Sequence, residues 1–357
     1  MANPAIHVDV DGIQVRVSSP DKVYFPQTGI TKRDLVDYVI CVGQGMLAGL
    51  RGRPTTLERW PGGVQEGTRL TTRSDSKGDA FFQKRAPDKR PEWVDVAEIT
   101  FPSGRTAWAI TPTNLATLVW AVNLGTLRFH PWPVTAPEVD LVDQLRIDLD
   151  PQPGTDFTDV VAGALELRRV MGELGLEPYP KSSGGRGLHV YARIIPATFV
   201  EARHAAIAIG RELARRMPET VTVEWWKELR GERVFIDFNQ MARDRLMASP
   251  YSIRPVPQAR VSAPLTWDEV PTVHPDDFTV LTMTQRYRER GDVWAPLYSS
   301  TPSSLQAAVE LYDRDVAAGQ GEMPYPPEYP KMPGEPPRVQ PSRQTRRDDE
   351  YSSPAVE

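Results

Sequence analysis

Cysteine and histidine are scarce in this chain, and the scarcity of cysteine removes two kinds of site. Of the 357 residues, one is cysteine and five are histidine. A lone Cys41 cannot build an intramolecular disulfide framework or a multi-cysteine zinc site. Its place in a helical pattern indicates a buried, inert thiol.

Long apolar runs are also missing. No stretch approaches the roughly 18 apolar residues that a membrane span needs, so we expect no membrane partner. The first residues, Met1-Ala2-Asn3-Pro4, lack a basic region followed by an apolar run, and we therefore expect no secretory signal. With 40% hydrophobic and 25% charged residues, the composition is typical of a soluble globular protein, and we expect a cytoplasmic one.

The chain has no excess of positive charge. Its formal net charge of −5 argues weakly against a simple nucleic-acid coat. An enzyme acting on nucleic acid needs only a local basic surface, because its phosphate contacts are local. Basic pairs such as Lys84-Arg85 and Lys89-Arg90 could supply one, although most such charges individually are solvated surface charge.

Two carboxylates end an apolar strand pattern at residues 144–150. Because side chains alternate along a strand, Asp148 and Asp150 point to the same face. Neighbouring carboxylates repel unless a cation separates them, and Mg²⁺ or Mn²⁺ prefers oxygen ligands. The alternative is a strand end with two solvated acids before a proline turn, where Arg146 could serve as an ion-pair partner.

A third carboxylate favours the metal. Asp237 lies in the apolar stretch 233–238, where an acid is costly unless it is paired or bound to a cation. Three aspartates on adjacent strands can hold two cations, which would activate an attacking hydroxyl and stabilise an in-line displacement.

The glycine-rich segment at residues 181–190 is not a Walker A loop, because it lacks the Lys-Ser/Thr ending and a strand rather than a helix follows it. Its hydroxyl, guanidinium, imidazole and backbone N–H groups could hold phosphate. Ser183 and Arg186 are the candidates for phosphate oxygens. His189 lies on the opposite face from its apolar neighbours, although a lone strand histidine is more often structural.

The remaining pattern predicts an α+β fold in which helices pack on the outer face of a sheet. The predicted elements are a hairpin at 5–17, a helix after Thr31, helices at 112–124, 156–174 and 199–216, and strands at 104–110, 187–195, 220–226 and 233–238. The proline density beyond residue 319 cannot support a helix or a strand ladder. We expect a catalytic domain at 1–300, an extended segment at 301–337 and a disordered polar tail at 338–357.

Together these motifs resemble the archaeo-eukaryotic primase superfamily, and most of all the polymerase domain of bacterial ligase D and its stand-alone relatives, the primase-polymerases. The resemblance covers about residues 5–300. The matching motifs are Asp148-Leu149-Asp150, the Ser-Gly-Gly-Arg-Gly-Leu-His run at 183–189, Val-Phe-Ile-Asp at 234–237, Asp21–Pro26, Arg59–Val64, Phe81–Lys84 and Pro250–Arg254. It implies central, mostly antiparallel β-sheets flanked by helices.

The resemblance also implies roles for individual residues. Asp148, Asp150 and Asp237 match the catalytic acids that hold two Mn²⁺ or Mg²⁺ ions. The nucleotide-binding positions are Ser183, Arg186, His189, His130, Arg254 and, less directly, Arg230 on a mobile loop of the family. Ligase D usually has lysine where this chain has Arg186, and arginine keeps the charge but changes the geometry.

On the DNA side, Lys22 and Lys32 match lysines that bind the 5′-phosphate downstream of a gap or break. The family often has asparagine at the position of Ser19, the third contact. Phe81 and Phe82 match an aromatic pair that stacks on the template base, and stacking tolerates any sequence.

The expected function is therefore template-directed nucleotidyl transfer in DNA repair, by end joining or excision repair, in the cytoplasm at the bacterial nucleoid. The resemblance implies gapped or broken DNA with a 5′-phosphate, ribonucleotides in preference to deoxyribonucleotides, and activity with manganese. Because no lysine-adenylation module is found after residue 300, we expect a separate ligase and possibly an end-binding protein as partners. A non-catalytic module that bridges DNA ends and a primase that starts chains unaided are the alternatives.

Overall fold

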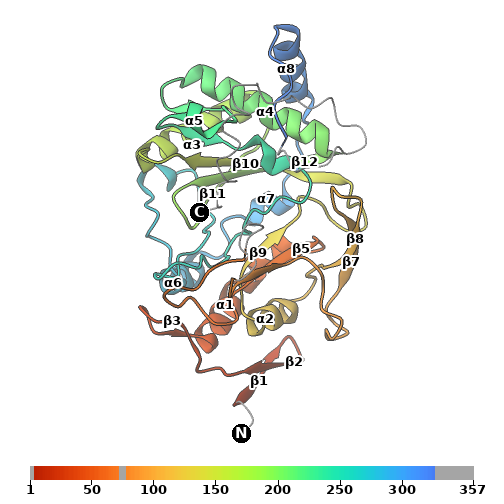
Figure 1. Cartoon of the computed structure of the whole chain (residues 1–357), viewed down its shortest axis with the longest axis vertical. Coiled ribbons are helices and arrows are strands. Elements are labelled where there is room, and N and C mark those ends of the chain that lie inside the picture. The colour runs from red at the N-terminus through yellow and green to blue at the C-terminus, as the bar shows by residue number, and fades with distance from the viewer. Residues whose placement is uncertain (1–3, 72–77, 326–357) are drawn as a thin grey trace.

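The computed structural model describes residues 4–71 and 78–325, and the predicted polar tail at 338–357 lies outside these residues. The described chain forms an α+β molecule with two five-stranded sheets, each with its own helices, as Figure 1 shows from below to above. The expected mostly antiparallel sheets are confirmed, since only the β13–β14 pair is parallel among the described strands of the two sheets.

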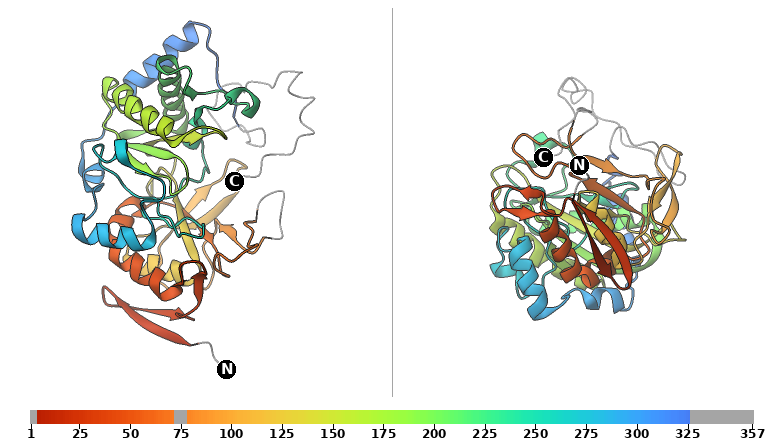
Figure 2. Two further views of the ribbon diagram at one scale, coloured as in Figure 1. Left: turned by 90° about the vertical axis from the view of Figure 1, so that its left-hand side faces the viewer. Right: turned by 90° about the horizontal axis from the view of Figure 1, so that it is seen from below.

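The first part of the chain builds the lower sheet and its helices. In order, its elements are β1 (Ala5–Val10), β2 (Ile13–Ser18), β3 (Val23–Phe25), β4 (Ile30–Thr31), α1 (Lys32–Leu50), β5 (Thr55–Arg59), β6 (Phe81–Gln83), β7 (Val96–Thr100), β8 (Thr106–Ile110), α2 (Leu115–Asn123) and β9 (Thr126–Pro131). The sheet runs β6-β5-β8-β7, with β9 also paired to β5. The β1–β2 hairpin projects from the lower end of the molecule (Figure 2).

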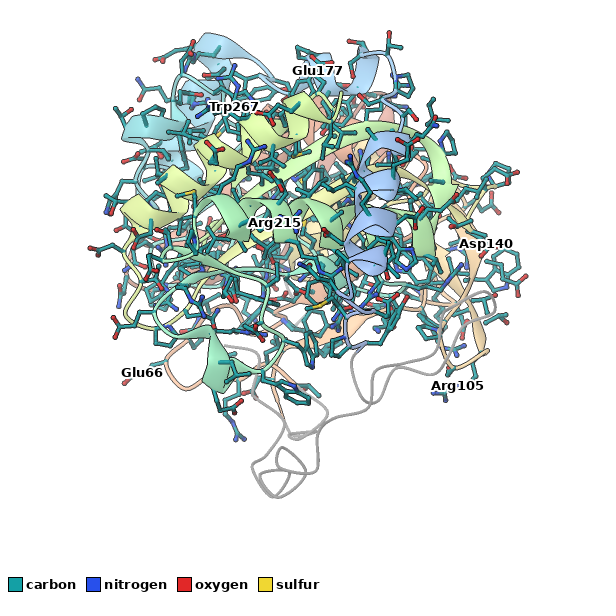
Figure 3. All side chains as sticks on the ribbon, turned by 90° about the horizontal axis from the view of Figure 1, so that it is seen from above. Glu66, Arg105, Asp140, Glu177, Arg215 and Trp267 are labelled. Atoms are coloured by element: carbon teal, nitrogen blue, oxygen red, sulfur yellow. The ribbon has the colours of Figure 1, made fainter. Side chains whose placement is uncertain are left out.

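The second part builds the upper sheet. Its elements are β10 (Leu141–Pro151), α3 (Phe157–Glu173), β11 (Tyr179–Ser182), β12 (Leu188–Thr198), α4 (Phe199–Arg216), β13 (Val221–Thr222), α5 (Lys227–Arg230), β14 (Val234–Ile236), the 3₁₀ turns η1 (Phe238–Met241) and η2 (Val270–Thr272), α6 (Val280–Arg290), α7 (Ala295–Ser299) and α8 (Gln306–Ala317). The strand order is β11-β12-β10-β14-β13. Helices α3 and α4 cover its upper face in Figure 1, and α8 crosses α4, on which Arg215 is labelled in Figure 3.

Helix starts follow local capping chemistry. Thr31 and Thr198 cap α1 and α4, each with an acid three residues later that bonds back to the cap backbone. The start of α2 was expected at Pro112 or Thr113, but the helix begins after Asn114. The Asn114 side chain accepts a hydrogen bond from the backbone N–H of Thr117, which makes it the effective cap.

Two further expectations need correction. The strands predicted at 220–226 and 233–238 are shorter, because the chain turns into α5 after the first and into η1 after the second. The segment from 301, expected to be extended, contains α8, whose Ala308 and Tyr312 pack into the core beside α4. No helix in the described ranges is both long and apolar enough to cross a bilayer.

Each sheet has its own hydrophobic core. The upper core joins the inner face of β10 and β12 to α3 and α4, with Leu145, Ile147 and Leu149 fully buried. The lower core joins α1 and α2 to β5 and β9. Because alternate residues of β10 face this core, its remaining side chains are directed to the opposite face of the sheet. That face carries the candidate site.

Candidate active site

The three predicted acids meet on the upper sheet. In β10, Leu149 pairs with Ile236 of β14, and the backbone N–H of Asp237 donates to the carbonyl of Asp148 over 3.1 Å. Asp148 and Asp237 are therefore opposite one another. Asp237 lies one residue beyond β14 rather than within a strand, and its Oδ1 accepts from the backbone N–H of Asn239, so it caps the η1 turn.

Like charges accumulate here. Burial, and then the carboxylates of Asp150 and Asp237, raise the pKa of Asp148 well above its usual range. Burial and the charge of Asp237 raise the pKa of Asp150. Asp150 nevertheless reaches solvent at the end of the strand. Arg146 does not relieve the repulsion: its guanidinium donates to the carbonyls of Pro131 and Trp132 instead.

The chemistry of the three acids suits a divalent cation. No group of three or more His, Cys, Asp or Glu side chains among the described residues is arranged as a ready-made metal site. Instead the amide nitrogen of Gln240 lies between Asp237, 3.0 Å away, and Asp148, 3.4 Å away. Its amide oxygen is buried without a partner. An all-oxygen carboxylate set with mutual repulsion suits Mg²⁺ or Mn²⁺.

The glycine-rich turn lies beside the end of β10. A Cβ on Gly187 would collide with the carbonyl oxygen of Leu149, so glycine is required for this approach. The Ser183 oxygen accepts from the N–H groups of Gly185 and Gly187. Those two N–H groups are thus already bonded within the turn and do not form the backbone phosphate site that the sequence predicted. The hydroxyl proton of Ser183 is left to donate.

Two arginines border this turn. The guanidinium of Arg254 forms no hydrogen bond within the described part of the chain, and it lies beside Gly185. Burial and the nearby charge of Arg128 lower its pKa to about 10, so it remains a cation at neutral pH. Arg186 is exposed and makes one long contact, 3.4 Å, to the carbonyl of Pro151. Both can receive an anion.

Arg230 is held more tightly. Its side chain donates to the carbonyls of Glu224 and Trp225 and to the Gln152 side chain, and it stacks on the Phe235 ring at 3.5 Å. Burial lowers its pKa, whereas the charges of Asp237 and Asp150 oppose that shift. The Arg230 guanidinium therefore lies close enough to Asp237 and Asp150 to interact with their charges.

His130 lies on the lower sheet, where it contacts a buried carboxylate. Its Nε2 is 3.0 Å from Glu58, which also binds the guanidinium of Arg128. The imidazole edge faces the Phe82 ring, with 5.7 Å between ring centres. The expected aromatic pair is half-buried on β6, and Arg59 covers the Phe81 ring at 5.1 Å. Phe82 is thereby adjacent to a predicted nucleotide contact.

The predicted 5′-phosphate contacts gather elsewhere, at the start of α1. The backbone N–H of Lys32 donates to the carbonyl of Lys22 over 2.8 Å, and burial, followed by the charge of Lys22, lowers the pKa of Lys32. Lys32 donates to the carbonyls of Ser18 and Asn123, and Lys22 donates to that of Pro61. Ser19 adopts a left-handed backbone with φ of 48°, a conformation that asparagine tolerates better than serine.

Comparisons with known proteins identify the family of the chain. Residues 31–294 match the family described as LigD, primase-polymerase domain. The chain belongs to the LigD primase-polymerase domain family. The predicted family, the fold and the enzyme class, a nucleotidyltransferase, are thereby confirmed.

Relatives of this primase-polymerase chain are longer. It is 33% identical over 323 residues to the multifunctional non-homologous end joining protein LigD of Mycolicibacterium smegmatis. The matched region covers 89% of this chain and 40% of that protein. It is 29% identical over 299 residues to the bifunctional non-homologous end joining protein LigD of Bacillus subtilis, covering 83% and 46%. The chain spans less than half the length of either.

A solved structure of similar fold is the polymerase domain from Mycobacterium tuberculosis ligase D in complex with DNA. It matches with a TM-score of 0.72 and 29% sequence identity, covering 80% of this chain and 98% of that one.

Sequence reasoning missed several residues of the primase-polymerase site. Glu58, Arg128 and Gln240 were not singled out, and the segment 55–60, which contains two threonines and Arg59, is too polar to mark Glu58 as a buried acid. Lys181 was noted only as the start of the glycine-rich segment. Glu58 reaches His130 through the pairing of β5 with β9, which a single sequence does not reveal, whereas Gln240 is only three residues from Asp237 and Lys181 eight residues from His189.

Proposed function

We propose that the chain is a template-directed DNA repair polymerase that fills short gaps or ends carrying a 5′-phosphate, with a preference for ribonucleotides. The observation that carries the proposal is the convergence of Asp148, Asp150 and Asp237 beside two cations that lack tight partners, Arg254 and Arg186. The family match supports it, as does the DNA complex named for the similar structure.

Each of these residues has its own role in the proposed reaction. Asp148, Asp150 and Asp237 would hold two Mn²⁺ or Mg²⁺ ions, which when bound favour ionisation of the primer 3′-hydroxyl and neutralise the reacting phosphates. Ser183 donates its free hydroxyl proton to a triphosphate oxygen. Arg254 and Arg186 stabilise the negative charge that passes to the leaving pyrophosphate.

The DNA contacts lie on the lower part of the molecule. Lys22 keeps an exposed ammonium for the 5′-phosphate, whereas buried Lys32 has two of its three N–H groups on carbonyls and one left to donate. Phe81 and Phe82 would stack on the template base near His130. A separate DNA ligase and possibly an end-binding protein would act with the chain, which we place in the cytoplasm at the nucleoid.

Gap filling with labelled nucleotides tests the proposal. Wild-type protein is given gapped DNA with or without a 5′-phosphate, ribo- or deoxyribonucleotides, and Mn²⁺ or Mg²⁺. We expect most product with ribonucleotides, manganese and a 5′-phosphate. Asp148→Ala should abolish incorporation while the protein still folds and binds DNA, and the matched control is Asp313→Ala, a change at an exposed position of α8.

The same reactions separate the alternatives. Binding and synapsis of DNA ends without incorporation by the wild type would indicate a bridging module. Products from template alone would indicate a primase. Full incorporation by the Asp148 variant would refute the acid assignment.

A further inference from the structure

A single row of polar side chains crosses the upper sheet. Lys181 of β11 pairs with His189 of β12, and His189 pairs with Asp148 of β10. Asp148 is in turn opposite Asp237. Directly opposed residues of neighbouring strands point to the same face. Lys181 is therefore connected to the acid cluster through one imidazole.

Lys181 is the unusual member of this row, because it is completely buried. Its Nζ lies 2.7 Å from His189 Nδ1, 2.5 Å from the Ser262 oxygen and 3.4 Å from the Ser182 carbonyl. No carboxylate lies within ion-pair distance of it in the described ranges. Burying a lysine without an acid is costly, and burial lowers its pKa well below the usual value.

The hydrogen-bond directions around Lys181 can be assigned. The Ser262 hydroxyl donates to the Ser182 carbonyl over 2.8 Å, so its oxygen accepts from Lys181. The ammonium thus has three N–H donors and three acceptors, the third being His189 Nδ1. A neutral amine would keep two N–H donors, and the two short contacts of Nζ, to the Ser262 oxygen and to Nδ1, are the ones that those donors would serve.

The other side of the ring leads to the same assignment. His189 Nε2 is 3.4 Å from Asp148 Oδ1. With Nδ1 accepting from Lys181, the proton of the neutral ring lies on Nε2, where it faces a carboxyl oxygen that can accept a hydrogen bond. With the opposite tautomer, an imidazole lone pair would face a carboxylate oxygen, and the proton on Nδ1 would face the lysine donors.

We propose that Lys181 is a positioning residue that holds His189 in the Nε2–H tautomer, with a neutral donor aimed at the acids and the incoming triphosphate. This inference rests on the proposed function, which places the nucleotide beside His189. An imidazole free to change tautomer would spend part of its time presenting a lone pair to carboxylate and phosphate oxygens. Fixing the tautomer removes that repulsive state before the nucleotide arrives.

The test is the nitrogen chemical shifts of His189 in protein labelled with ¹⁵N-histidine. The chain has five histidines, and the signals missing from a His189→Asn variant identify those of His189. We expect wild-type protein to give an unprotonated Nδ1 and a protonated Nε2 at neutral pH. A protonated Nδ1 in the wild type would overturn the proposal, without need of any further variant.

Two variants complete the experiment. Lys181→Met keeps the length of the side chain but removes its N–H groups, so we expect the His189 shifts to move toward a mixture of tautomers. The matched control, Ser262→Ala, removes a neighbouring acceptor of Lys181 and leaves the contact with Nδ1, so the tautomer should persist. Unchanged His189 shifts in folded Lys181→Met would also overturn the proposal.

Kinetics supply the functional readout. Loss of one directed hydrogen bond predicts a rise of about tenfold in the KM for the nucleotide in Lys181→Met, with DNA affinity unchanged. An unaltered nucleotide KM in that variant would contradict the role in positioning. Failure of the proposed function is distinguishable, because it would appear as absent incorporation by the wild type while the nitrogen shifts remain measurable.

Discussion

Glu58 is a carboxylate with no exposed surface, and its surroundings determine how the lower sheet responds to acid. Burial by itself would raise its pKa, but the charge of Arg128 and the hydrogen bond with His130 lower it to about 2. The Trp60 indole also donates to it. The ionised form is thus fully bonded, and protonation would break that arrangement.

A folded-state pKa below the unfolded value of 4.5 means that Glu58 stabilises the protein above pH 4.5, and that this stability is lost as pH falls toward 2. We expect Glu58→Gln to lower the unfolding free energy at pH 7 by about 3 kcal/mol, with the difference from wild type shrinking below pH 4.5. Urea unfolding at several pH values measures it. Exposed Glu98→Gln is the control, and equal losses for both variants would contradict the account.

At the scale of elements, the site depends on how closely the glycine-rich turn approaches β10. Gly187 lies against the Leu149 carbonyl, where any side chain would displace the turn that carries Ser183 and Arg186. We expect Gly187→Ala to reduce nucleotide incorporation at least tenfold, since small displacements of positioned groups cost about two orders of magnitude in rate.

The matched control is Gly172→Ala near the end of α3. A Cβ there meets nothing within 4 Å, and alanine should stabilise the helix by up to about 1 kcal/mol without changing incorporation. Gap filling and thermal unfolding of both variants decide the point. Normal incorporation by Gly187→Ala would mean that the turn does not need its close contact with β10.

Local chemistry explains which elements were predictable. The sequence predicted α4 at residues 199–216, as observed, because Thr198, Glu201 and an apolar stripe all act within that segment. The start of α2 was missed, since Asn114 competes with Pro112 for the cap. The acids and the glycine-rich turn were found as motifs. Glu58, the partner of His130, was not found because the pairing of β5 with β9 brings it there from a distant segment. Gln240 and Lys181 lie near Asp237 and His189 in the chain, but no motif marked them.

At the scale of the whole molecule, the C-terminal part of the described chain is fastened to the back of the site. We call residues 319–325 the strap. Fully buried Arg203 of α4 donates to Glu322, Met323 and Pro324 in the strap. The same guanidinium donates to Asn239 Oδ1, next to the turn that Asp237 caps. Arg203 therefore links the strap to the turn that Asp237 caps.

Glu322 holds the strap through three partners, Arg203, His204 and the Tyr312 hydroxyl. Breaking a buried ion pair by removing one charge costs about 3 kcal/mol or more. We expect Glu322→Gln to lower the unfolding free energy by about that amount, and exposed Glu310→Gln of α8 to change it little. Denaturant unfolding compares the two, and equal stability of the variants would show that the strap is held by other contacts.

The contacts of Arg203 also order events during synthesis. A ribosome delivers a chain from its N-terminus, so Asp148 is made long before the strap. The turn that carries Asp237 acquires its last contacts only when residues 322–325 have emerged. A nascent chain that already contains all three acids therefore lacks the support that fixes the third one. The candidate site therefore gains this support only after residues 322–325 have been made.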